Sequence, residues 1–239
     1  MDTPRDEAFD IHSADVCDTY RQAIARADQG VRTISFDEKT GMQALEPLTA
    51  GKPVRPGHIE KREFEYKRHG TQALLAGMDV VTGKIIPLVR DTRTEQDFSD
   101  WLNRTLMSDP HAVGWHFVMD RLNTHMSEAA VMAVARVEGT PDNELGVKGK
   151  SGILKNMKTR AAYLSDTSHK IVFHYTPKHA SWLNQIEIWF SILVRRFLKR
   201  NSFTSKENLK ARLHLFVDFF NEKMAKPFKW TYKGRPLQV

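Results

Sequence analysis

Three acidic residues occupy positions where a carboxylate can do chemistry. Asp37 lies near the end of the alternating, β-branched segment "VRTISFDE", and Asp120 closes the apolar segment "GWHFVMD". Glu187 lies within "YTPKHASWLNQIEIWF", where aromatic residues surround it in the sequence. A carboxylate is costly to bury unless it is hydrogen-bonded, paired or bound to a cation. The pattern therefore raises the question of which positive group these acids face.

Three converging carboxylates repel one another, and some take up protons unless a cation lies among them. Oxygen ligands favour Mg²⁺ or Mn²⁺ over zinc, and the single cysteine, Cys17, excludes a cysteine-built zinc site. Two such ions can activate a water or hydroxyl and stabilise the leaving oxygen of a phosphodiester. Other interpretations stay open. Each acid alone suits a turn, a cap or a solvated helix face, and a carboxylate pair also suits a glycosidase.

The elements that must position these acids alternate between helices and strands, which is typical of an α/β domain. At 239 residues, 41% hydrophobic and 27% charged, the chain suits one or two domains with a full core. The Gly- and Lys-rich residues 139–156 are predicted to form an irregular insert. Hydrophobic spacing and turn residues predict helices at 11–28, 93–107, 127–137, 181–200 and 205–224, strands at 31–38, 114–120 and 170–177, and a hairpin at about 71–89.

The strands of Asp37 and Asp120 are expected to be neighbours in one mixed sheet, with the hairpin on the outer side. The carboxyl ends of parallel strands meet at one edge, where α/β sheets place ligands. Because strand side chains alternate between faces, Glu38 is expected to point away from Asp37 and is kept as the second candidate. A helical wheel puts Glu187 at the border of an apolar stripe, with Asn184 beside it, so it can lean over this edge.

Two groups of histidines have more than one interpretation. His125 follows Asp120 by five positions and suits either a contact with the site or DNA, or a structural hydrogen bond. His174 and His179 flank "YTPK", and a metal-binding pair is the alternative to two separate structural roles.

The charge is distributed unevenly along the chain. Residues 145–239 carry 19 Lys and Arg against 5 Asp and Glu, whereas residues 1–144 carry 17 against 24. A basic half suggests a polyanionic partner, with nucleic acid as the first candidate, and a solvated basic surface is the equal alternative. No apolar run reaches the roughly 18 residues of a membrane helix, and the acidic start is unlike a signal peptide, so we expect a cytoplasmic protein without a membrane partner. The expected phosphate contacts are Lys178, Arg195, Arg196, Lys199 and Arg200.

Three blocks occur in the order "ISFDEKTGMQAL" (34–45), "FVMDRLNTH" (117–125) and "YTPKHASWLNQIEIWFSIL" (175–193). Together they resemble the DDE-superfamily insertion-sequence transposases, in the branch related to mariner elements. The resemblance implies an RNase H-like (retroviral integrase-like) mixed β-sheet flanked by helices, with a C-terminal helical extension. It also implies a catalytic, metal-binding triad of Asp37, Asp120 and Glu187 that uses Mg²⁺ or Mn²⁺, as two ions, to cut and join DNA strands.

The same resemblance extends to domains and partners. It implies a helical lead-in at 1–30, a catalytic domain at 31–200 and a C-terminal helix and basic tail at 201–239. The expected partners are the element's terminal repeats and target DNA in a bacterial nucleoid, and a homodimer is compatible with the sequence. Asn123, His125 and Asn184 are expected to support the site.

Three features depart from the family pattern. Arg121 stands where the family usually has Asn, which suits either a phosphate contact or a weakened metal site. The interval from Asp120 to Glu187 is 67 positions, longer than is common, and residues 139–156 account for the excess. Only about 30 residues precede the first strand, too few for the usual helix-turn-helix region. We therefore expect a catalytic domain alone, from a fragment, a split reading frame or a decayed copy, with an inactive DNA-binding remnant as the alternative.

Overall fold

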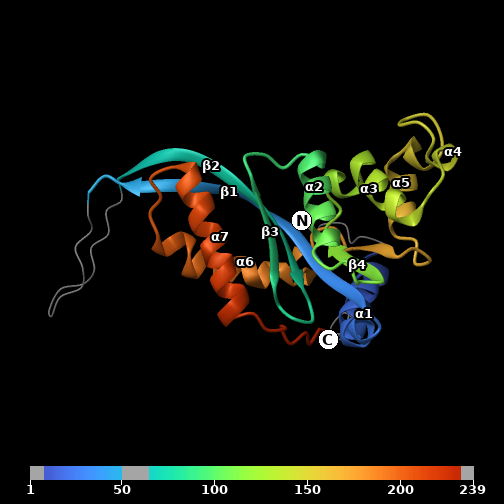
Figure 1. Ribbon diagram of the computed structural model, residues 1–239, viewed down its shortest axis with the longest axis horizontal. Helices are drawn as coiled ribbons and strands as arrows, with labels where there is room; N and C mark the ends of the chain where they lie inside the picture. The colour runs from blue at the N-terminus through green and yellow to red at the C-terminus, as the bar shows by residue number, and fades with distance from the viewer. Residues whose placement is uncertain (1–7, 50–64, 233–239) are drawn as a thin grey trace, which may run out of the picture.

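The computed structural model describes residues 8–49 and 65–232. The Gly/Pro-rich segment "TAGKPVRPG" (49–57) predicts a connection after the first strand, and most of it lies outside the described residues, as does the end of the tail. A five-stranded sheet forms the centre, in the order β3-β2-β1-β4-β5 (Figure 1). The strands are β1 (Val31–Pro47), β2 (Tyr66–Asp79), β3 (Ile85–Arg90), β4 (Gly114–Met119) and β5 (Ile171–Tyr175).

The sheet has the predicted mixture of strand directions. β1 pairs antiparallel with β2, which pairs antiparallel with β3. β1 also pairs parallel with β4, which pairs parallel with β5. The predicted neighbours 31–38 and 114–120 therefore lie side by side in one sheet, and the hairpin lies outside them.

The first strand is much longer than predicted, because β1 continues to Pro47. Its parallel pairing with β4 ends at Ser35, whereas its antiparallel pairing with β2 continues to the end of the strand. β1 and β2 thus extend together beyond the other strands as a two-stranded ribbon (Figure 1). The prediction stopped early because Gly41 and the charged residues around it hide the buried Met42 and Ala44.

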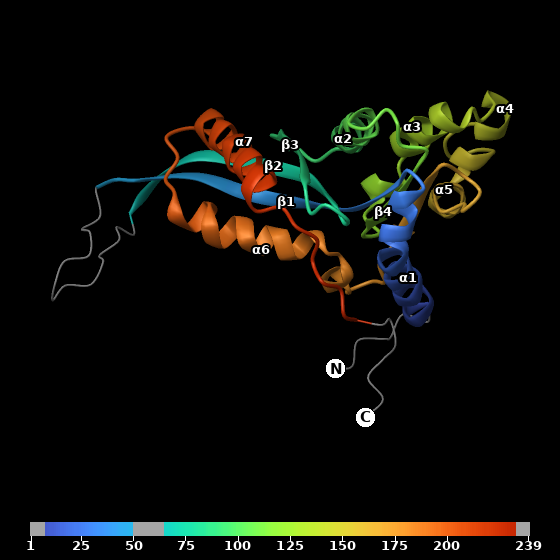
Figure 2. The same ribbon diagram turned by 60° about the horizontal axis from the view of Figure 1, so that its bottom comes forward.

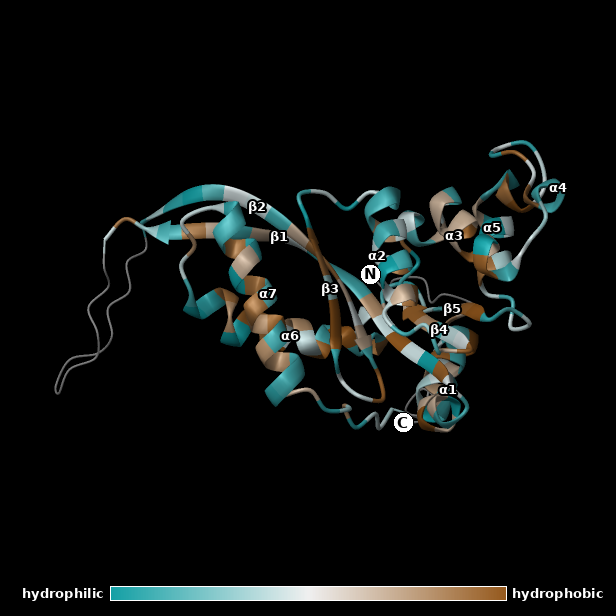
Figure 3. Cartoon of the chain, in the orientation of Figure 1, coloured by the Kyte–Doolittle hydropathy of each residue, from teal (hydrophilic) through white to brown (hydrophobic). Residues whose placement is uncertain are grey.

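Helices cover both faces of the sheet. Figure 2 shows α6 along one side of β1, with α2 and α3 on the other side. Figure 3 shows that β3 and the short strand β4 are largely hydrophobic, whereas the outer end of β2 is hydrophilic. The helices are α1 (Phe9–Asp28), α2 (Glu95–Met107), α3 (Glu128–Glu138), α4 (Asp142–Leu145), α5 (Met157–Leu164), α6 (Ile186–Arg196) and α7 (Lys206–Lys223), with 3-10 turns η1 (Asn123–Met126), η2 (Ile153–Lys155), η3 (Ser181–Leu183) and η4 (Leu198–Arg200).

Local sequence explains where several helices begin. The Thr94 side chain accepts from the amide of Asp97, and Asp97 bonds back to the Thr94 amide, so this capping box starts α2 at the predicted place. The predicted helix at 181–200 is divided, because Asn184 has an extended backbone between η3 and α6. That break leaves the Asn184 side chain free to bond the sheet instead of continuing a helix.

The segment between β4 and β5 is more ordered than predicted. Residues 139–156 contain α4 and η2, and α5 follows them, a helix that the sequence did not reveal. α5 has an Asn156 capping box but buries only Leu164, so its amphipathic signal is weak. Leu145, Leu154 and Leu164 all join the core formed by α2, α3 and the sheet. The insert is therefore packed into the domain.

The chain beyond α7 returns across the molecule to the first helix. At the β2–β3 turn, a Cβ on Gly83 would lie 2.2 Å from the Lys226 carbonyl oxygen, so only glycine fits there. Further on, the Trp230 ring packs edge-on against Tyr20 of α1, with ring centroids 5.0 Å apart. We call residues 225–232 the C-terminal strap. Among the described helices, none is long and apolar enough to cross a membrane.

Candidate active site

Asp37 lies on β1 two residues beyond its last pairing with β4, facing the side of α6. Its side chain is buried; one oxygen accepts from the Glu38 amide at 2.8 Å, and the other from Asn184 Nδ2 at 3.4 Å. Burial, followed by the negative charge of Asp120, raises the pKa of Asp37 to about 7. We predicted that Asp37 lies at the end of its strand, but β1 continues to Pro47. Asp37 instead lies just beyond the point where the parallel part of the sheet stops.

Asp120 follows β4 directly and is connected to Glu38 through a histidine. His125 Nδ1 lies 2.8 Å from Asp120 Oδ1, and His125 Nε2 lies 3.0 Å from Glu38 Oε1. The imidazole is fully buried and the Glu38 side chain is 3% exposed. Glu38 does point to the opposite face from Asp37, as predicted, yet it contacts the site through this imidazole. Of the two interpretations of His125, the structure shows a hydrogen bond within the site.

The charges of this trio are coupled. Burial alone would lower the pKa of His125, but its hydrogen bonds to Asp120 and Glu38 raise that pKa to about 10. Burial opposes ionisation of Asp120, yet the hydrogen bond and charge of His125 bring the Asp120 pKa below its ordinary value. The raised pKa of His125 favours an imidazolium beside Asp120 at neutral pH, and the pKa of the neighbouring Asp37 lies near neutrality.

Asn184 joins the first turn of α6 to the strand that carries Asp37. Its Nδ2 donates to the Phe36 carbonyl at 2.7 Å, and its Oδ1 accepts from the Ser35 hydroxyl. The Ser35 oxygen in turn accepts from the amide of Ile186 at 2.9 Å. These buried bonds fix the start of α6 against β1, three residues before Glu187. Asn184 thus contacts Asp37 directly, and its supporting role in the site stays a prediction.

Glu187 lies in the first turn of α6, half-buried, on the helix that Asn184 fixes. An acid is favoured there by the helix dipole. Within residues 8–49 and 65–232, no three or more His, Cys, Asp or Glu side chains are arranged as a ready metal-binding group. The structure therefore brings Asp37 and Asp120 together with Glu38 and His125, and the triad that includes Glu187 stays a prediction.

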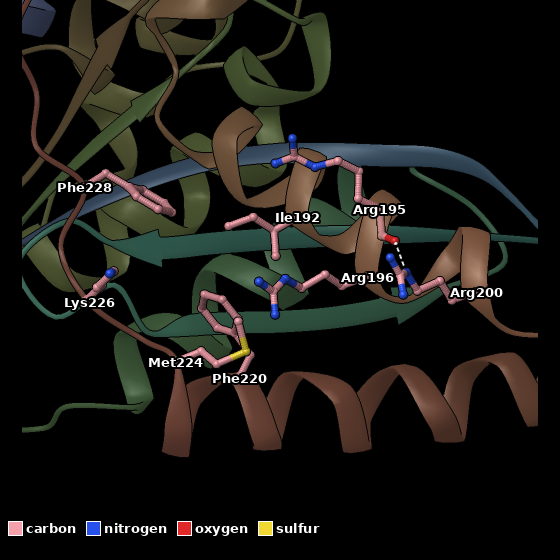
Figure 4. A pocket seen from close by; sticks show the side chains of 8 residues that line it. All are labelled: Ile192, Arg195, Arg196, Arg200, Phe220, Met224, Lys226 and Phe228. Atoms are coloured by element: carbon pink, nitrogen blue, oxygen red, sulfur yellow. Dashed lines mark hydrogen bonds between the residues drawn. The ribbon is translucent and has the colours of Figure 1, made fainter.

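The predicted basic cluster divides between two pockets around the second half of α6. Arg195, Arg196 and Arg200 line a cavity of about 790 Å³ between α6, α7 and the C-terminal strap, which we call the α6–α7 pocket (Figure 4). Lys226 adds a fourth cation, over a floor of Ile192, Phe220, Met224 and Phe228. Lys199 lines a different cavity beside the β1–β2 ribbon.

The remaining predicted residues lie on the other side of Asp120. Arg121 turns away from the acids, donates to His12 Nε2 at 2.7 Å and lies over the Tyr175 ring. Asn123 and Lys178 line the same cavity as Arg121. The alternative of a metal-binding pair of His174 and His179 is not formed, because buried His174 bonds Asp15 and His116 instead. Sequence reasoning missed Lys158 of α5, although the basic run "KNMKTR" (155–160), which includes the capping Asn156, was a usable signal.

The parallel order of β1, β4 and β5, with acids where the first two meet, is that of an RNase H-like domain. Residues 32–210 match the family model of DDE superfamily endonucleases, and the chain belongs to that family. A comparison with curated proteins gives no match.

Solved structures of the Mos1 mariner transposase are similar in fold. The Mos1 catalytic domain with Raltegravir and Mn has a TM-score of 0.53 at 12% identity, covering 91% of this chain and 85% of that one. The Mos1 paired-end complex with Mn gives 0.51 at 12% identity, over 92% of this chain and 62% of that one. The paired-end complex with the left transposon end gives 0.52 at 14% identity, over 91% and 57%. This chain therefore spans about three fifths of the longer Mos1 chains.

Proposed function

We propose that this chain is the catalytic part of a DNA transposase, which cleaves DNA strands and joins them elsewhere with the help of a divalent metal. One observation carries the proposal: Asp37 on β1 and Asp120, directly after the adjacent parallel strand β4, lie close enough for the charge of Asp120 to add to burial in raising the pKa of Asp37 to about 7. Such a pair costs stability unless a cation is drawn to it. Membership of an endonuclease family supports a phosphodiester as the substrate.

The donor set fits a hard divalent cation. Carboxylate oxygens suit Mg²⁺ or Mn²⁺, and a raised pKa marks Asp37 as a group whose proton such a cation would displace. Asp37 and Asp120 would hold the metal, with Glu187 completing the set, and we propose two ions. When bound, the metal supplies Lewis acidity and lowers the pKa of a bound water or hydroxyl. The Mos1 structures determined with Mn support divalent-metal use.

The chain's own residues supply position and charge. His125 holds the Asp120 carboxylate in one orientation and Glu38 holds His125, so the acid does not swing with the loop that follows β4. Asn184 fixes the position of the helix that carries Glu187 relative to Asp37, through its hydrogen bonds to the Phe36 carbonyl and to Asp37. Rigid placement of acids is what in-line attack on a phosphodiester requires.

The DNA backbone is proposed to contact the α6–α7 pocket. The described part of the chain offers Arg195, Arg196 and Arg200 no carboxylate within ion-pair distance. Unpaired cations gathered around one hollow attract phosphates and release counterions on binding. Terminal repeats and target DNA are the proposed partners, and two copies of the chain would act together on two element ends.

Nicking of supercoiled plasmid in Mn²⁺ tests this function. The wild-type chain should nick, and Asp120→Asn should lose nicking while still binding DNA. Mn²⁺ should also raise the Tm of the wild-type chain and not that of Asp120→Asn, because an ion that binds only the folded state stabilises it. Full nicking by Asp120→Asn would overturn the proposal. DNA binding without nicking or Mn²⁺ stabilisation in the wild type would favour the inactive DNA-binding remnant.

A further inference from the structure

A second basic cavity lies along the sheet edge from the acids, on the side away from α6. It has a volume of about 750 Å³ and takes its walls from α1, the residues after β4, α5 and the end of β5. Arg121, Lys158 and Lys178 are its cations, and no Asp or Glu lines it. We call it the α5 pocket. Its size is within the range of pockets that hold a small ligand or a short piece of polymer.

The wall that α5 contributes is firmly attached to the domain. Arg160 Nε donates to the Met126 carbonyl at 2.6 Å, and its Nη1 donates to the Leu154 carbonyl at 3.2 Å. One guanidinium thus ties α5 and η2 to the residue that follows His125. Because His125 contacts Asp120, the insert is connected through two residues to the acid pair. Lys158 is therefore presented on a rigid element.

The cations of the α5 pocket lack acidic partners. Lys158 and Lys178 are exposed, and neither they nor Arg121 pairs with a carboxylate in the region that the structure covers. Arg121 is instead held by His12 and by the face of Tyr175, 5.9 Å from the guanidinium to the ring centroid. Its side chain is oriented without being neutralised. The positive charge of this pocket is complementary to the negative charge of a chain of phosphates.

We propose that the α5 pocket holds the sugar-phosphate backbone of the DNA strand beside the phosphate on which the acids act. This inference rests on the proposed function. Neighbouring strands lie about 4.8 Å apart, so the end of β5 is roughly 10 Å from Asp37 along the edge, one or two nucleotides along a strand. The α6–α7 pocket lies on the other side of Glu187, so the two pockets would contact DNA on either side of the acids.

This assignment accounts for two departures of the sequence from its family pattern. Arg121 replaces the usual Asn directly after Asp120, and the insert lengthens the interval to Glu187. Arg121 forms one wall of the pocket, and α5, which directly follows the insert and is bonded to it through Arg160, forms another. The Arg side chain therefore serves phosphate contact and leaves the metal site alone.

The first experiment removes the exposed cations and measures binding to a DNA duplex over a range of salt. Lys158→Ala combined with Lys178→Ala should lower the log–log salt slope by roughly 1 to 2 units. The matched control is Lys150→Ala combined with Lys155→Ala, which removes the same charge from exposed sites on the insert outside the pocket. The control should leave the slope unchanged. Equal slopes for both double variants, in a wild type that binds DNA, would overturn the pocket and leave the proposed function standing.

The second experiment places a cross-linker in the pocket. Cys17 is fully buried, so a cysteine introduced at an exposed site is selectively labelled with a benzophenone maleimide. Labelled Lys158→Cys should cross-link to bound DNA upon illumination, and labelled Lys155→Cys should give only the background of the wild-type chain. Equal cross-linking at both positions would contradict the pocket. A wild type that shows no salt-dependent DNA binding would instead overturn the proposed function and this inference together.

Discussion

The two ends of α6 are built in opposite ways. At its start, Asn184 is fully buried and bonds both Phe36 and Ser35 of β1. At its end, Arg195 and Arg196 are exposed, with Arg195 bonded only to the Ser191 carbonyl of its own helix. One end is fixed by buried polar contacts, and the other presents unpaired charge on long, flexible side chains.

The difference between the two ends of α6 follows from their surroundings, which are the buried sheet at the start and solvent at the end. A buried, hydrogen-bonded group holds its neighbours in one geometry, and its loss leaves unsatisfied partners that cost free energy. An exposed cation contributes little to folding but adds to long-range attraction for a polyanion. Changes near the acids should therefore lower the stability of the domain, and changes at the far end should lower only its affinity for DNA.

The largest effect is expected from His125→Ala. It removes the cation between Asp120 and Glu38 and leaves the Glu38 carboxylate buried without a partner. Breaking a buried pair in this way costs about 3–5 kcal/mol. Denaturant unfolding at pH 7 measures the loss. The double change His125→Ala with Glu38→Ala should recover part of it, and no recovery would show that the imidazole acts through packing instead of charge.

Asp37→Asn should stabilise the metal-free protein at pH 8, on the order of 2 to 4 kcal/mol. The pKa of Asp37 is about 7 in the folded state against an ordinary 3.8, so the folded state binds more protons than the unfolded state between these values. Stability from this group is therefore full below pH 3.8, is lost progressively as the pH rises toward 7, and changes little above that. The unfolding free energies of the two proteins should converge below about pH 4, separate between about pH 4 and 7, and keep a nearly constant difference above pH 7. A difference that does not change between pH 4 and 7 would contradict the raised pKa of Asp37.

A smaller loss is expected from Asn184→Ala, about 1–3 kcal/mol, because the Phe36 carbonyl and Ser35 hydroxyl lose a buried partner. Metal-dependent nicking should fall as well, since the helix of Glu187 loses its attachment to the strand of Asp37. The control is Asn143→Ala, an exposed asparagine of α4 whose replacement should change stability by less than about 0.5 kcal/mol. Equal losses for the two variants would contradict a positioning role for Asn184.

The smallest effect on folding is expected from Arg195→Ala combined with Arg196→Ala, within about 0.5 kcal/mol of the wild type. The same double variant should lower the log–log salt slope of DNA binding by roughly 2 units. Thermal unfolding and a salt titration of binding measure the two quantities on one preparation. A folded variant with an unchanged slope would assign these arginines to solvated surface.

The sequence predicted the parts of the fold that are determined locally. Alternation placed the strand of Asp37, an apolar run placed the strand that precedes Asp120, and hydrophobic spacing placed α2. The outer half of β1 and helix α5 were missed because their burial comes from packing by distant elements, which leaves little periodicity in the segment itself.

The sequence pointed to Asp37 and Asp120 as acids of the site, but it did not predict the hydrogen bonds that hold Asp120 in place. Glu38 was expected to face away from Asp37, and it does, but the turn η1 returns His125 to both Glu38 and Asp120. Nothing in the spacing of these three residues fixes that contact, because it depends on how η1 packs on α2 and the sheet. Whether Glu187 joins the aspartates is likewise a question of helix placement, which the mutations above address.

The C-terminal strap has a consequence for synthesis on the ribosome. α1 is made before the other described elements, yet one of its faces is covered by Trp230, 210 positions later in the chain. Contacts this distant in sequence form slowly and only after the intervening chain has emerged. Until then Tyr20 and the apolar residues beside it lie open to water. The nascent chain therefore exposes apolar residues of α1 to water for nearly the whole of translation. This exposure makes it a candidate substrate for a chaperone that binds unfolded chains.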